Sequence, residues 1–119
     1  MIWLAVAGGG AIGSLLRYGL VVLTAPLGAP QWVILLINAA GSLAIGALWG
    51  LADRMSLDAV LRDGVAVGVL GSFTTMSAFA WDAFRWLQAG AWLQAGLYIV
   101  ATLMLCTALA GLGYVWMRA

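Results

Sequence analysis

The sequence has no histidine, no lysine and only one cysteine, Cys106. Charged side chains make up 8% of the 119 residues, as five arginines and four acidic residues. A single cysteine excludes an internal disulfide and a cluster of thiolate metal ligands. The net charge of +1 gives no electrostatic reason to expect a nucleic-acid partner. Since there is also no carboxylate pair and no plausible nucleophile–base pair, we do not expect an enzyme.

Apolar residues are abundant instead: they account for 66% of the chain and give a mean hydropathy of +1.10. Soluble domains are about half apolar and about a quarter charged. So few polar residues could not cover a soluble core, which indicates an integral membrane protein. The N-terminus lacks the basic region of a signal peptide, so we expect it to be part of the mature structure. We expect a multi-pass protein of the inner (plasma) membrane.

Four apolar segments have about the length needed to cross a bilayer as helices. We expect spans at residues 2–23, 31–51, 64–86 and 92–117, which together form one all-α transmembrane domain over residues 1–119. None of the segments shows the period-two alternation of a membrane β-barrel. The strongly polar connector is "ADRMSLDAVLRD", residues 52–63.

The third segment contains "GSFTTMSAF" (71–79), with glycine and several hydroxyl side chains near its middle. Such residues compete with helical hydrogen bonds, so the stretch predicts a break in the third helix. A break exposes carbonyl groups, which can hold a cation where protein surrounds them. Beyond it, Met76 and Phe79 are three residues apart and share a helix face. The positive edge of an aromatic ring there would favour a small anion.

Two other segments carry polar or small residues at four-residue spacing, which places them on one helix face. In the second segment they are Asn38, Ser42, Gly46 and Gly50, and in the fourth they are Tyr98, Thr102 and Cys106. Either stripe alone is explained by interhelical hydrogen bonds, which are weak on average. Together with a broken third helix, they favour a narrow polar pathway.

Arg17 lies inside the first segment, where a charged side chain is costly. It could extend to the membrane interface, or it could stand at the mouth of an anion path. With four spans, Arg54, Arg62 and Arg118 lie on the side of the termini, and Arg85 lies on the other side with Arg17. This weak bias leaves both a single topology and insertion in two orientations open.

Glycines four residues apart occur at 9 and 13, at 46 and 50, and at 64 and 68. This spacing allows helices to approach closely in lipid, and generic packing accounts for most of these pairs.

The chain resembles the CrcB/Fluc family of fluoride channels. The matching stretches are "GGGAIGSLLRY" (8–18), "NAAGSLAIG" (38–46) and "GVLGSFTTMSAFAWD" (68–82), and their order and spacing agree across the whole chain. The resemblance implies a passive fluoride channel that exports fluoride and lowers its cytoplasmic level. It also implies an antiparallel, dual-topology homodimer with two pores along its interface and a structural sodium ion at its centre.

The resemblance assigns roles to individual residues. The backbone carbonyls of Gly71 and Thr74 would hold the sodium ion. With Ser42 added from the second-segment stripe, the expected anion path consists of Asn38, Ser42, Met76, Phe79, Tyr98, Thr102 and Arg17, with Cys106 continuing the track of the fourth segment.

The chain departs from the family pattern at four places. Met76 replaces one of two paired phenylalanines, and Ser72 replaces the second glycine of a pair. Residues 33–35, Val-Ile-Leu, replace Gly-Thr-Leu, and Cys106 stands where serine is common. A methionine sulfur would repel an anion, so we expect a working channel with an altered rate.

Two other readings remain open. A proton-coupled small multidrug transporter also has four helices and dual topology, but it needs a glutamate in the first span, where this chain has only Arg17. A structural subunit of a larger complex would not need the polar stripes and the break together. The sequence also leaves open whether the chain pairs with itself or with a paralogue.

Overall fold

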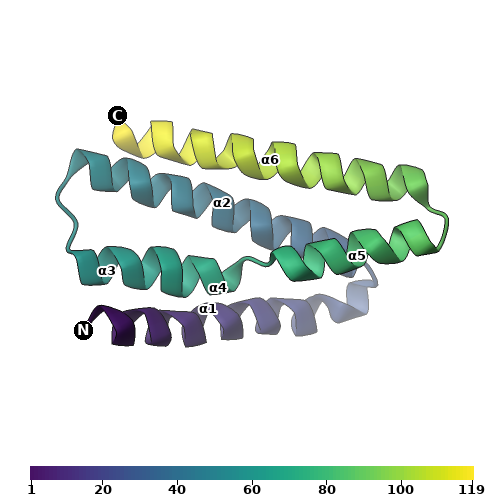
Figure 1. Cartoon of the computed structure of the whole chain (residues 1–119), viewed down its shortest axis with the longest axis horizontal. Helices are drawn as coiled ribbons and strands as arrows, with labels where there is room; N and C mark the ends of the chain where they lie inside the picture. Colours follow the sequence, from purple (N-terminus) through teal and green to yellow (C-terminus); the bar gives the residue numbers. More distant parts are fainter.

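A computed structural model describes all residues, 1–119, and the protein is entirely helical (Figure 1). Four helical stretches are long and apolar enough to cross a membrane: Ile2–Leu27, Pro30–Arg54, Ala59–Gln88 and Trp92–Arg118. Both termini and the connector between the second and third stretches lie at one end of the molecule, which is 49 Å long (Figure 1). The expected all-α membrane fold with an interrupted third helix is confirmed.

Three of the four spans are continuous helices. The first consists of α1 (Ile2–Thr24) and the short 3₁₀ helix η1 (Ala25–Leu27), and Gly28 ends it with a positive φ of 68°. The second is α2 (Pro30–Arg54), which begins with proline at a position where a missing N–H leaves no helical bond unmade. The fourth is α6 (Trp92–Arg118). Each runs slightly beyond the span expected from hydropathy.

The third span is assembled from four pieces. They are α3 (Ala59–Asp63), the π-helical η2 (Gly64–Leu70), α4 (Gly71–Phe73) and, after two extended residues, α5 (Met76–Gln88). The span begins at residue 59 rather than 64 because an Asp58 side-chain oxygen accepts hydrogen bonds from the N–H groups of Val60 and Leu61, at 3.0 and 3.1 Å. Most of the predicted polar connector is therefore helical.

Glycines bring the helices into close contact. A side chain at Gly9 or Gly13 would collide with backbone atoms of η2, and one at Gly46 or Gly50 would collide with the backbone of α6. Gly68 likewise lets α1 pack closely, since a Cβ atom at Gly68 would lie 2.8 Å from the Val6 carbonyl oxygen. All three spaced pairs thus belong to helix contacts, as small residues do in membrane proteins.

The interior is small and the outer surface is apolar. Only 20 of 119 residues are buried, and large apolar side chains along α1 and α6 point outward. In water this arrangement would leave the hydrophobic effect unused. It suits a protein whose solvent is lipid.

Candidate functional site: the break in the third span

The break lies at Thr74 and Thr75, both of which have extended backbone with ψ of 159° and 115°. The Thr74 N–H and hydroxyl both donate to the Leu70 carbonyl, at 3.1 and 3.0 Å, which closes the end of α4. The Thr75 hydroxyl accepts from the Ala78 N–H at 3.2 Å and caps α5. The threonines therefore end one helix and start the next. The break falls one turn later than Gly71, which itself is helical.

Asn38, on α2, holds the break through both ends of its amide. Its Oδ1 accepts from the Thr75 N–H at 2.7 Å, and its Nδ2 donates to the Thr75 carbonyl at 3.0 Å. In a continuous helix the Thr75 N–H would instead donate to the Gly71 carbonyl. Asn38 thus leaves the Gly71 carbonyl without its helical donor. One N–H of the Asn38 amide is not needed for this contact.

Gly41 makes room for the break on the next turn of α2. A Cβ atom at this position would collide with the Thr74 methyl group and would lie 3.5 Å from the Phe73 ring. Sequence analysis missed this role. The available signal is the spacing, since Gly41 follows Asn38 by three residues and so lies on the same helix face.

Arg17 approaches the break from α1, where its Nε donates to the Ser72 carbonyl at 3.2 Å. The side chain is half-buried, and it is not part of the wall of the cavity described next.

A cavity of about 320 Å³ lies beside the break, between α2, η2, α5 and α6. Its wall brings together most of the residues that sequence analysis assigned to an ion path or a cation site: Asn38, Ser42, Gly71, Thr74, Met76, Phe79, Thr102 and Cys106. Gly46 and Gly50, from the same stripe as Asn38, are absent from the wall because they pack against α6. Tyr98 and Arg17 are also outside it.

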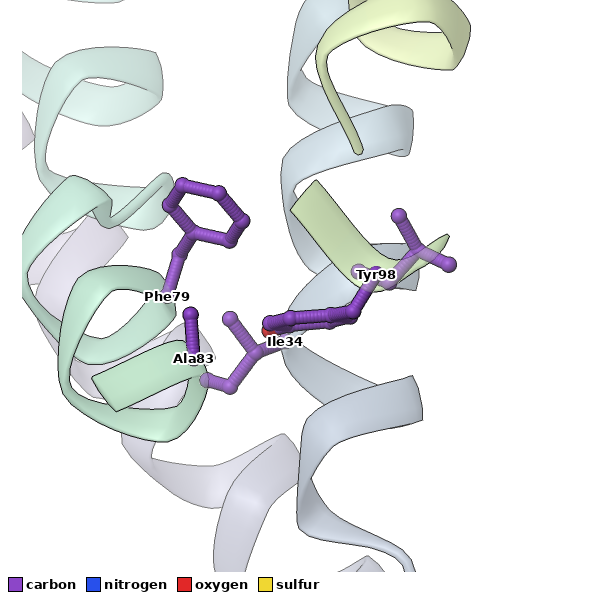
Figure 2. Packing of buried hydrophobic residues seen from close by; sticks show 5 residues of the cluster. Ile34, Phe79, Ala83 and Tyr98 are labelled. Atoms are coloured by element: carbon purple, nitrogen blue, oxygen red, sulfur yellow. The ribbon is translucent and has the colours of Figure 1, made fainter. Parts of the chain in front are cut away.

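Phe79 and Met76 line the same cavity but differ in burial. Phe79 is 8% exposed and packs with its ring 5.2 Å from that of Tyr98, among Ile34 and Ala83 (Figure 2). Met76, at the start of α5, is 68% exposed. The apolar Ile34 and its neighbour Leu35 belong to the same packed cluster as Phe79.

Two buried side-chain hydroxyl groups of α6 residues have no hydrogen-bond partner in the protein. They belong to Tyr98, 1% exposed, and to Thr102, 5% exposed and in the cavity wall. A buried hydroxyl without a partner is destabilising. These two residues lie one helical turn apart, and Asn38 and Asp82 are also polar residues of the buried interior.

Comparison with known proteins identifies the family. The model of the family described as "CrcB-like protein, Camphor Resistance (CrcB)" matches residues 4–114. A protein of Thermus thermophilus named "Fluoride-specific ion channel FluC" is 46% identical over 114 residues, covering 94% of this chain and 91% of its own. Proteins of the same name from Nitratidesulfovibrio vulgaris and Shewanella amazonensis are 39% and 35% identical, over 87% and 92% of this chain and 86% and 90% of their own. The chain belongs to the CrcB family.

Proposed function

We propose that this protein is a fluoride-selective channel of the plasma membrane, which exports fluoride passively and lowers its cytoplasmic level. Family membership and relatives named as fluoride-specific channels support this function. The observation that carries it in this chain is the cavity beside the broken helix, where a buried asparagine, an aromatic ring and an unpartnered hydroxyl meet.

The cavity offers weak, neutral contacts for an anion that has lost water. The free N–H of Asn38 and the hydroxyl of Thr102 are donors, and the Phe79 ring can present its positive edge. Ser42 and Met76 also line the wall, and Tyr98 carries a second unpartnered hydroxyl one helical turn from Thr102. No basic side chain lines the wall, so an anion would be attracted without being held tightly.

A cation site at the break is the second part of the proposal. The Gly71 carbonyl has lost its helical donor, and Thr74 lies where the chain turns extended. Neutral oxygen ligands without a carboxylate suit a hard monovalent ion. Two antiparallel copies of the chain would place four such carbonyls around one sodium ion at the dimer centre. The ion would coordinate exposed carbonyl oxygens for which lipid offers no hydrogen-bond donor. Exchanging sodium for a large organic cation should then lower fluoride flux.

Fluoride efflux from liposomes that contain the purified protein tests the function, with chloride efflux as the control. A channel predicts rapid fluoride efflux that needs no proton gradient, and little chloride efflux. A multidrug transporter would instead couple protons to a cationic drug. Its acidic residue is missing here, because the first acidic residue of the chain is Asp53, at the end of α2. Drug-coupled proton flux without fluoride flux would overturn the proposal.

A further inference from the structure

Arg17 is a charged residue in a membrane span without an acidic partner. The protein's one ion pair joins Arg62 and Asp63, far from it in the sequence. A guanidinium in a span needs compensating polar contacts, commonly backbone carbonyls. Arg17 finds one at the Ser72 carbonyl, 3.2 Å from its Nε.

The contact replaces a helical hydrogen bond that the break removes. In a continuous helix the Ser72 carbonyl would accept from the N–H of Met76. Met76 instead begins α5, beyond two extended residues. A charged donor is stronger than a neutral amide, so Arg17 suits the free end of α4 well.

Close packing of α1 against η2 and α4 allows the Arg17 side chain to reach the Ser72 carbonyl. One turn before Arg17, a Cβ atom at Gly13 would collide with the Val69 carbonyl and lie 3.0 Å from the Phe73 N–H nitrogen. A Cβ atom at Gly10 would lie 3.3 Å from the Ser72 hydroxyl oxygen. The two small residues bring the helix axis against the end of η2 and α4, which leaves the arginine beside the break.

We infer that Arg17 is a positioning residue for the break and does not line the anion path. It holds the Ser72 carbonyl from α1, while Asn38 holds the Thr75 peptide group from α2. The Ser72 carbonyl is thereby occupied, whereas the Gly71 carbonyl is left without its helical donor. The effect on transport rests on the proposed function, but the structural role of Arg17 at the break does not.

Three substitutions separate this role from that of a positive charge at a pore mouth. In Arg17→Gln the amide nitrogen occupies the position of Nε along the side chain, so a neutral donor remains. Arg17→Met has a methyl group at that position and no donor. Arg17→Lys keeps the charge but carries its nitrogen one atom farther out.

The first measurement is amide hydrogen exchange in peptides that cover residues 71–78, which requires no transport activity. Losing a hydrogen bond from a charged donor should raise exchange at the break about tenfold or more in Arg17→Met. Arg17→Gln should stay close to the wild type. Equal exchange in the Gln and Met variants would overturn the inference, even if the protein conducts no fluoride.

Fluoride flux is the second measurement. Positioning predicts that Arg17→Gln retains most of the flux and Arg17→Met loses most of it. A charge at the pore mouth predicts that Arg17→Lys retains flux while Gln and Met lose it equally, and that result would contradict the inference. Helical content of each variant, measured by circular dichroism, identifies a variant that fails to fold. If Arg17→Met does not fold, the flux of Arg17→Gln alone distinguishes the two roles: retained flux supports positioning, and lost flux contradicts it.

Discussion

At the scale of single residues, Asn38 shows how one side chain serves both the fold and the proposed path. Its spacing with Ser42 marked it as a polar residue facing a pathway. The sequence could not show that its amide pairs with Thr75, because that contact depends on where α4 ends and how α2 meets it. Most of the proposed path was likewise named from the sequence, but Gly41 was not, since its role is to leave space.

Asn38→Asp should abolish fluoride flux. The carboxylate keeps an acceptor for the Thr75 N–H, but it loses both N–H donors and adds a negative charge at the cavity wall. Gln31→Glu makes the same chemical change near the start of α2 and should leave flux nearly unchanged. Fluoride efflux from liposomes measures both variants. Normal flux in a folded Asn38→Asp protein would return Asn38 to a packing role.

Phe79→Ile should strongly reduce fluoride flux, because it removes the ring edge from the cavity wall. Met76→Phe should keep or raise the flux, since it supplies a second ring in place of a sulfur. Phe84→Ile is the matched control, as Phe84 is on the same helix, 48% exposed and outside the cavity wall. If Phe79→Ile and Phe84→Ile conduct equally well, Phe79 contributes only to packing against Tyr98.

At the scale of elements, the third span shows where sequence reasoning succeeds and where it stops. Glycine and hydroxyl residues in "GSFTTMSAF" predicted the break. They did not predict that Gly71–Phe73 stays helical or that a π-helical stretch precedes it. The end of α4 depends on the Thr74 contacts with Leu70 and on Asn38 from a neighbouring helix. Nothing in the structure explains the π-helical stretch. Glycine spacing likewise indicated close helix contacts without identifying which helices meet.

Gly9→Ala should destabilise the fold by about 1–3 kcal/mol, because the new methyl group would meet the η2 backbone, which cannot move aside easily. Gly8→Ala is the control from the adjacent position. No atom lies within 4 Å of its added Cβ, and alanine favours the helix by up to about 1 kcal/mol. Unfolding in detergent measures the difference. Equal stability of the two variants would show that α1 does not pack tightly on η2.

At the scale of the whole molecule, the two ends differ by only a few arginines. The end with both termini carries Arg54, Arg62 and Arg118, and Arg85 lies towards the other end, near the end of α5 (Figure 1). Such a small difference sets orientation weakly. It is compatible with the proposed antiparallel dimer, which needs copies inserted both ways.

Reporter fusions at the C-terminus should therefore give signals on both sides of the membrane. Adding two arginines after Ala119 should bias insertion and lower fluoride flux, because parallel copies could not pair. Adding two serines at the same place controls for the longer chain. A single fixed orientation of the unmodified protein would exclude an antiparallel homodimer.

The central claim is that the assembled protein conducts fluoride passively and selectively. It is tested most directly by recording current across a planar bilayer that contains the purified protein, with unequal fluoride and equal chloride on the two sides. The account predicts a current whose reversal potential follows the fluoride gradient and does not shift when chloride or pH is changed on one side. A reversal potential that follows chloride or protons, or the absence of any fluoride current, would contradict it.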